Sequence, residues 1–372
     1  MDRKNRSPRF HIERRASLPW HKSLAVRLLS ILAAFIVCAL LTMIITGVNP
    51  GDFISTMFYG SFGTPRKMWI TAQNVAVLLC ISLAVTPSFL MKFWNEGADG
   101  QILMGCLASS ACMIKLSDKM PNWLLIVVMF LTSVAAGTLW GIIPAFFKAQ
   151  FNTNETLFTL MLNYIATQIV AYFIVKWEVP KGSGQIGIIN QSTETGWFPQ
   201  LFGNKYILSI LTAAIMTAFI YSYIRYSKHG YELTVVGEST RTARYIGIDV
   251  KRVIVRTMAL SGAMAGAVGF LLVSGINHTL TTTITGGQGF TAVMVSWLAQ
   301  FNPIAMIATS FLIIFLERGA IEISSAFTLN QSFSAILTGI ILFFLIGSEF
   351  FVSYRIRRSA NTETGKEPDK NV

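Results

Sequence analysis

The sequence predicts an all-α, polytopic membrane helical bundle, and three features support this fold class: composition, long apolar runs and the placement of basic residues. Of its 372 residues, 53% are hydrophobic and only 13% are charged. Soluble domains carry about 25% charged residues, so most of this chain lies where charge is costly. Because no long polar stretch could fold on its own, we expect one membrane bundle.

The apolar runs are long enough for membrane-spanning helices, which need about 20 such residues. They cover residues 28–46, 68–91, 123–147, 156–175, 206–224, 257–276, 290–316 and 331–348. The run 290–316 is interrupted by Asn302 and Pro303, and a further run, 102–114, is too short for a plain span. We therefore predict about 8–10 transmembrane segments, with short or broken helices at the midplane.

Basic residues indicate which side of the membrane each loop faces. Residues 1–27, 225–256 and 353–372 hold eight, seven and five Lys or Arg. Such clusters mark the cytoplasmic side, so the N- and C-termini are predicted to be cytoplasmic. The chain is thus predicted to have a basic N-terminal segment 1–27, a transmembrane domain 28–352 and a polar tail 353–372 that is disordered from residue 359. Within the transmembrane domain, the loop 225–252 is predicted to be cytoplasmic. The loop 176–205 is predicted to be extracytoplasmic and could hold short strands.

The composition and motifs exclude several classes of protein. The net charge of +12 does not indicate nucleic-acid binding, because Lys and Arg form no stripe with stacking aromatics. The four cysteines lie in apolar runs without a CxxC pair, which predicts neither disulfides nor a metal site. We find no phosphate-binding G-x-x-x-x-G-K-[ST] loop, no H-E-x-x-H and no Ser/His/Asp spacing of note. The chain is predicted to have no catalytic residues and no cofactor, and to take its energy from another subunit.

The loop 225–252 is the most informative stretch. Between Gly237 and Gly247 the sequence predicts one short helix, which Ser239 or Thr240 would cap. A compact helix with apolar residues at a cytoplasmic turn would dock into a groove on a motor subunit. The alternative is a solvated basic connector.

This loop resembles the cytoplasmic G-x-N-x-x-A-A-x-Y-x-G-I motif of ABC permeases of the branched-chain amino acid and simple-sugar superfamily, especially its nucleoside/simple-sugar branch. The matching residues are Gly237, Ala243, Tyr245, Gly247 and Ile248. The chain departs from the motif with Ser239 in place of Asn and Thr242 in place of the first Ala.

Other stretches extend the resemblance over residues from about 70 to 350. Residues 93–101 resemble F-N-I-G-x-E-G-Q, with Trp94 inserted and Glu96 where Ile is usual, and residues 154–164 resemble N-E-x-x-x-T-L-M-L-N-Y. Residues 261–269 are similar to S-G-x-x-A-G-x-x-G, a small-residue face that allows close helix packing. The departure is largest at residues 291–299, where T-A-V-M-V-S-W-L-A replaces D-G-I-A-V-A-L-L-G.

The resemblance implies a permease subunit of an ABC importer in the plasma membrane of a bacterium. It implies three partners: an ABC ATPase subunit that uses the ATP, a second permease subunit, and an extracytoplasmic substrate-binding lipoprotein. Nucleosides are the first expected cargo and simple sugars the second. The residues expected to dock the ATPase are Gly237, Glu238, Arg241, Ala243, Arg244, Tyr245 and Gly247, and those expected along the substrate pathway are Asn95, Gln101, Glu155, Asn163 and Phe290.

Alternatives remain open at the level of both site and function. Glycine-rich, polar starts to short apolar segments, near residues 97 and 286, are typical of interrupted helices at a substrate site. Phe290 or Trp297 could stack on a nucleobase or a sugar ring, although an aromatic residue in a helix is more often part of the core. Amides within spans, however, more often hold helices together than contact cargo. The alternative functions are a permease for branched-chain amino acids or another small polar solute, a self-sufficient secondary transporter with a buried acidic ion site, and, last, a membrane enzyme.

Overall fold

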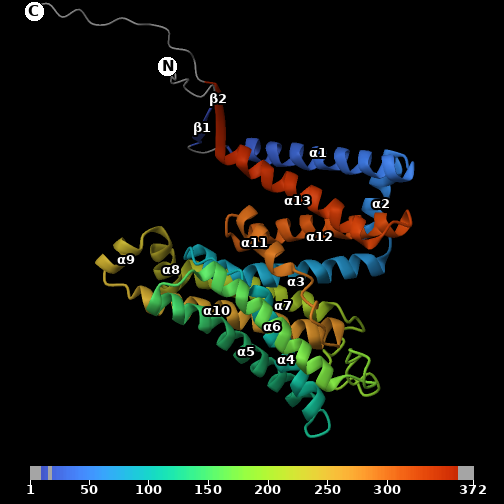
Figure 1. The fold of residues 1–372 in the computed structure, drawn as a ribbon, viewed down its shortest axis with the longest axis vertical. Helices are drawn as coiled ribbons and strands as arrows, with labels where there is room; N and C mark the ends of the chain where they lie inside the picture. Colours follow the sequence, from blue (N-terminus) through green and yellow to red (C-terminus); the bar gives the residue numbers. More distant parts are fainter. Residues whose placement is uncertain (1–9, 16–18, 359–372) are drawn as a thin grey trace, which may run out of the picture. The chain divides into compact units, whose positions relative to one another are not determined.

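The computed structural model describes residues 10–15 and 19–358, most of which are helical (Figure 1). Within these residues, eight helices are long and apolar enough to cross a membrane. They are α1 (Trp20–Thr46), α3 (Pro65–Leu90), α5 (Asn122–Phe151), α6 (Glu155–Trp177), α7 (Ile207–Tyr226), α10 (Val250–Phe270) with its π-helical continuation η1 (Leu271–Asn277), α12 (Pro303–Ala326) and α13 (Gln331–Ser353). The all-α, polytopic membrane bundle is thus confirmed.

The same residues form shorter helices and two short strands. These are α2 (Pro50–Phe62), α4 (Ala98–Leu116), α8 (Lys228–Glu238), α9 (Thr240–Tyr245), α11 (Gln288–Leu298), β1 (Phe10–Arg14) and β2 (Tyr354–Arg358). The short apolar run 102–114 lies in α4. The break at Asn302 and Pro303 separates α11 from α12, as predicted.

The chain divides into two compact units, which are described separately: unit 1 combines residues 1–56 with 320–372, and unit 2 covers residues 57–319. In unit 1, α1 packs along α13, and Arg27 Nη2 lies 2.9 Å from Glu349 Oε2 in an ion pair between them. Strand β1 precedes α1, strand β2 follows α13, and the two strands pair antiparallel. The first residues of α1 and the last residues of α13 therefore lie at the same end of unit 1.

Unit 2 is built around α10, which packs against α5, α4 and α3. A Cβ added at Gly262 of α10 would lie only 2.3 Å from the carbonyl oxygen of Gly137 on α5, and one at Gly266 would lie 2.3 Å from that of Ser133. The Ser133 hydroxyl itself lies 2.7 and 2.8 Å from the carbonyl oxygens of Gly105 and Gly266. Small residues permit backbones to approach this closely, and the predicted packing face on α10 is confirmed.

The two ends of unit 2 carry different loops. Helices α8 and α9 lie just before the first residue of α10 and at one end of the unit (Figure 1). The loop 176–205 contacts the other end of the same long helix, where the Ile189 amide donates to the carbonyl oxygen of His278, 2.8 Å away. These two loops therefore lie at opposite ends of the long helix formed by α10 and η1.

Several details differ from the sequence-based expectations. Helix α1 begins at Trp20, although the apolar run begins at residue 28. Helix α2 and the strands β1 and β2 were not predicted. In the loop 176–205 the described backbone forms only an isolated bridge between Leu201 and Asn204. The tail predicted to be disordered, residues 359–372, lies outside the described residues, and the predicted domain boundaries stay a prediction.

Candidate functional site

The first interrupted segment lies between α3 and α4. After α3 ends, Lys92 takes a left-handed conformation (φ 57°), and the Phe93 amide turns back to the carbonyl oxygen of Ser88 (2.9 Å). The chain becomes helical again at Ala98. The polar residues predicted to start a short apolar segment therefore do lie at a helix break.

Asn95 is the centre of a buried hydrogen-bond network that joins this break to α10. Its Nδ2 donates to Ser261 Oγ (3.2 Å), and its Oδ1 accepts from the Gly97 amide (3.1 Å) and from Gln101 Nε2 (3.3 Å). Asn95 and Gln101 are 0% and 1% exposed. Buried polar groups need such partners because they cannot reach water, so these two amides hold the broken segment in place.

Asn163 fastens the same break to α6. Its Oδ1 accepts from the Gly100 amide (2.8 Å), and its Nδ2 donates to the carbonyl oxygen of Glu96 (2.7 Å). One turn earlier on α6, Thr159 Oγ1 accepts from the Glu96 amide (3.2 Å). A Cβ at Gly100 would lie 2.8 Å from Asn163 Oδ1, so this approach requires glycine. Side chains of α6 thus satisfy main-chain groups that the break leaves without helical partners.

Glu155 does not join these amides. Its Oε2 lies 2.8 Å from Lys148 Nζ in an ion pair that closes the turn between α5 and α6. The structure therefore brings together three of the predicted pathway residues, Asn95, Gln101 and Asn163, as contacts between helices, and gives Glu155 a separate contact.

The second interrupted segment meets the first. Gly286 and Gly287, both with positive φ (58° and 72°), lead into α11, and the Gly289 amide in its first turn donates to Asp99 Oδ1 of α4 (3.1 Å). A Cβ at Gly289 would lie 2.8 Å from Asp99 Cγ. The negative charge of the Asp99 carboxylate is also stabilised by the positive end of the α11 dipole. We call residues 95–101 and 286–290 together the break junction.

Three aromatic side chains are exposed at or beside the break junction. Phe290 and Trp297 on α11 are 49% and 47% exposed, and Trp94 in the α3–α4 break is 42% exposed. Residues seven apart share one face of a helix, so Phe290 and Trp297 project from the same side of α11. Trp94 and Trp297 meet edge to face, with ring centroids 5.2 Å apart and planes at 61°. We call Trp94, Phe290 and Trp297 the aromatic face.

The loop 225–252 forms two helices, α8 and α9, each capped by a serine. Ser227 Oγ and Ser239 Oγ each accept from the main-chain amide three residues later (2.9 and 3.2 Å). The predicted short helix and its cap at Ser239 are therefore confirmed. Gly247 follows α9 with a φ of 86°, a left-handed conformation that favours glycine.

Helix α8 is also fastened to the end of α7. His229 Nδ1 and the Tyr223 hydroxyl form a hydrogen bond. Burial lowers the pKa of His229, Glu232 opposes this shift and Arg256 adds to it, so the imidazole is neutral near pH 7. The loop is thus held to the membrane helix without a buried charge.

The residues predicted to dock an ATPase divide into two groups. Tyr245 is 92% exposed, and four others are also exposed: Glu238, Arg241, Arg244 and Gly247. Gly237 and Ala243 are buried, and Ala243 is 0% exposed. Ala243 is expected among the docking residues, where it would face the ATPase, but its side chain instead lies inside the protein among apolar residues of α8 and α10.

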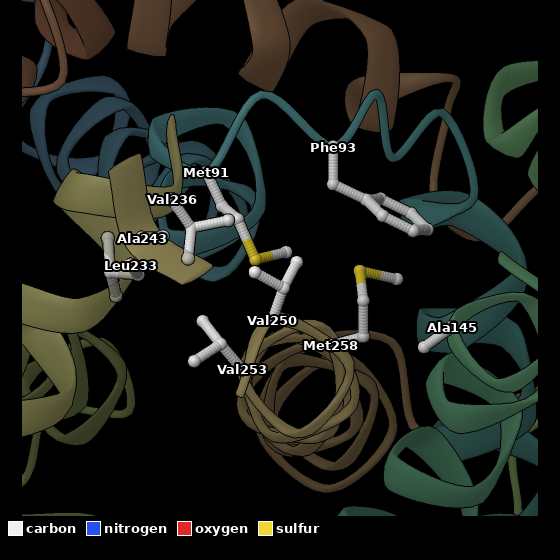
Figure 2. Close-up of a cluster of buried hydrophobic side chains, with 9 residues drawn as sticks. All are labelled: Met91, Phe93, Ala145, Leu233, Val236, Ala243, Val250, Val253 and Met258. Carbon is white, nitrogen blue, oxygen red and sulfur yellow. The ribbon is translucent and has the colours of Figure 1, made fainter. Parts of the chain in front are cut away.

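A hydrophobic cluster joins the loop to the first helix break (Figure 2). Its buried members are Met91 and Phe93 from the break, Ala145 from α5, Leu233 and Val236 from α8, Ala243 from α9, and Val250, Val253 and Met258 from α10. In Figure 2 the Phe93 ring and the Met258 side chain point toward each other. Phe93 stands two residues before Asn95, so the cluster continues directly into the buried hydrogen-bond network.

Replacing Gly237 with Ala is expected to loosen α8 from α3, because the new Cβ would lie 2.1 Å from the carbonyl oxygen of Leu90. Trypsin should then cleave the loop after Arg241 or Arg244 about ten-fold faster, since cleavage follows local opening. The control is Glu238→Ala at the neighbouring exposed position. Equal cleavage of the two variants would show that α8 does not depend on this close approach.

The fold and site define a multi-pass membrane protein of the transport class, with two interrupted helices that meet and a structured loop at one end. Within the residues that the structure describes, no group of three or more His, Cys, Asp or Glu is placed to hold a metal ion.

The comparison with protein families identifies the kind of transporter. Residues 68–346 match the family described as branched-chain amino acid transport system / permease component. This match covers well over half of the chain, and the chain belongs to this family. It is a permease, a transport component.

Individual relatives have similar lengths. The chain is 24% identical to the glucose ABC transporter permease protein TsgB13 of Haloferax volcanii, over 93% of each chain. It is 27% identical to the guanosine ABC transporter permease protein NupP of Bacillus subtilis, over 87% of this chain and 93% of the relative. It is 24% identical to the nucleoside ABC transporter permease protein NupB of Lactococcus lactis, over 94% of this chain and 98% of the relative. The first two organisms each have a second permease protein among the similar sequences.

Proposed function

We propose that this chain is one of two permease subunits of a plasma-membrane ABC importer that carries nucleosides. The similarity to permeases named for guanosine and nucleosides supports this cargo. A simple sugar is the second candidate, because a glucose permease is similar over almost the whole chain. Uptake of labelled guanosine and labelled glucose by cells with and without the gene separates the two.

The partners follow from the same proposal. An ATPase subunit docks on the exposed residues of α8 and α9 and uses the ATP. A second permease completes the pathway, as the paired relatives in two organisms suggest. A binding lipoprotein delivers cargo on the opposite side, where the loop 176–205 lies. The clustered Lys and Arg of the loop 225–252 support the cytoplasmic side for α8 and α9.

The observation that carries the proposal is the continuous packing from the loop to the break junction. Tyr245 and Arg241 are exposed for a partner, while Leu233 and Val236 of the same loop are buried in the cluster that also holds Met91 and Phe93. A close-packed interior transmits a displacement instead of absorbing it. A movement of the ATPase against α9 would therefore shift the segment that ends at Asn95, and with it the contact between the two interrupted helices.

Replacing the exposed Tyr245 of α9 tests whether the ATPase docks on this loop. Tyr245→Ala is expected to weaken ATPase binding by about 2 kcal/mol, or about 30-fold, because the hot spots of interfaces are enriched in Tyr, Trp and Arg. The joint change Arg241→Glu and Arg244→Glu should act in the same direction. Co-purification of the ATPase with the tagged permease measures both.

A matched control is Tyr172→Ala on α6, since Tyr172 is 63% exposed but lies far along the chain from the loop. This variant should retain the ATPase. Full retention of the ATPase by Tyr245→Ala and by the double Arg variant would make the loop a solvated connector and would remove the docking proposal.

A further inference from the structure

We infer that Trp94 and Trp297 select the cargo by contacting a flat heteroaromatic ring, such as a nucleobase. The inference rests on the proposed function, because it assumes that cargo passes the break junction. It adds a specificity role for two side chains that are not among the expected pathway residues: Trp297, which the sequence offers only as a stacking alternative to Phe290, and Trp94, to which it gives no role.

The two indoles are held in place and yet remain open on one side. Trp94 packs against Phe89, which is 5% exposed, with ring centroids 5.8 Å apart and planes at 78°. Its other contact is Trp297, which α11 supplies. Close to half of each indole remains exposed. Rigid aromatic rings of this kind offer a large contact area at a low entropic cost.

The polar atoms of the pair complement a nucleobase. Among the described residues, neither indole N–H has a hydrogen-bond partner, and an indole N–H is a donor only. A nucleobase offers ring nitrogens and carbonyl oxygens as acceptors next to a π-face, and base–aromatic stacking is sequence-tolerant because every base has such a face. A simple sugar has hydroxyl groups but no planar ring. The pair therefore favours a nucleoside over a sugar.

The two residues come from two stretches that depart from the family patterns described above. Trp94 is the insertion within the stretch 93–101, and Trp297 lies in the stretch 291–299, where the chain departs most from the family pattern. These two departures touch each other in space.

Uptake of labelled guanosine by the assembled transporter tests the inference. Trp94→Ala and Trp297→Ala are each expected to lower the guanosine uptake rate about ten-fold or more, since a stacking contact is lost. Trp94→Phe and Trp297→Phe should stay within about three-fold of the wild type, because they keep a ring. The matched control is Trp69→Ala: Trp69 is 38% exposed and stacks on Tyr206, with centroids 6.2 Å apart.

Co-purification of the second permease, measured on the same variants, separates the outcomes. Unchanged guanosine uptake in both Ala variants would overturn the inference and leave the proposed function intact. Lost uptake together with a lost second permease would make the indoles subunit contacts and would also overturn it. A wild type that carries glucose but not guanosine would overturn the inference while the permease assignment stands. A wild type without ATP-dependent uptake of either solute would remove the proposed function itself.

Discussion

A single methyl group added at Gly262 or Gly266 is expected to destabilise this helical bundle strongly. The new Cβ would lie 2.3 Å from a main-chain carbonyl oxygen of α5 in each case. A backbone atom inside a membrane bundle cannot swing aside as a flexible side chain does, so the helices α5 and α10 must separate. Overpacking costs about 1–3 kcal/mol and occasionally more, and we expect Gly262→Ala and Gly266→Ala to reach or exceed the upper value.

Fluorescence-detected size-exclusion chromatography of the heated protein measures this effect as a fall in the apparent melting temperature. The matched control is Gly339→Ala on α13, where an added Cβ would meet no atom within 4 Å. That variant should keep or slightly raise stability, because alanine favours helices over glycine. Melting within about 2 °C of the wild type for Gly262→Ala and Gly266→Ala would contradict the close packing of α5 and α10.

The sequence was sufficient to predict the membrane bundle because hydrophobicity and length decide it. Lipid forces every main-chain group into helical hydrogen bonds, so an apolar run of the right length has one outcome. The break at Asn302 and Pro303 could also be predicted from the sequence, because proline has no main-chain N–H to donate a hydrogen bond inside a helix. Helix α2 was not predicted, because its polar residues interrupt the apolar run that would have marked it.

Contacts between distant residues were beyond the sequence. The polar starts near residues 97 and 286 were each recognised, but nothing in a single sequence shows that the Gly289 amide reaches Asp99. The pairing of β1 with β2 could not be predicted from the sequence either, because the two strands are more than 300 residues apart in the chain. In the sequence Trp94 is only an insertion, and its contact with Trp297 exists only in the folded chain.

The docking motif shows how a recognised pattern can combine two purposes. Tyr245 is exposed, as a docking residue should be, whereas Gly237 and Ala243 are buried. Small size at these two positions lets α8 approach α3 and lets α9 pack on the cluster. The motif alone does not separate residues that shape the loop from residues that are proposed to face a partner.

Replacing Asn95 with Leu is expected to lower stability and transport together. The leucine has a similar size but would leave two buried donors without an acceptor, the Gly97 amide and Gln101 Nε2, and would remove the bond to Ser261. An unpaired buried donor costs about 1–3 kcal/mol. The helix break would then lose its connection to α10, and the break junction would no longer be held in one arrangement.

The control for this change is Gln168→Leu, which also replaces an amide by leucine but at an exposed position of α6. It should leave both the melting temperature and guanosine uptake close to those of the wild type, because no buried group loses a partner. A cargo-binding Asn95 would behave differently from a structural one: Asn95→Leu would then stop uptake at an unchanged melting temperature. Since Asn95 is 0% exposed, we expect both quantities to fall, and unchanged stability with lost uptake would instead place Asn95 on the substrate path.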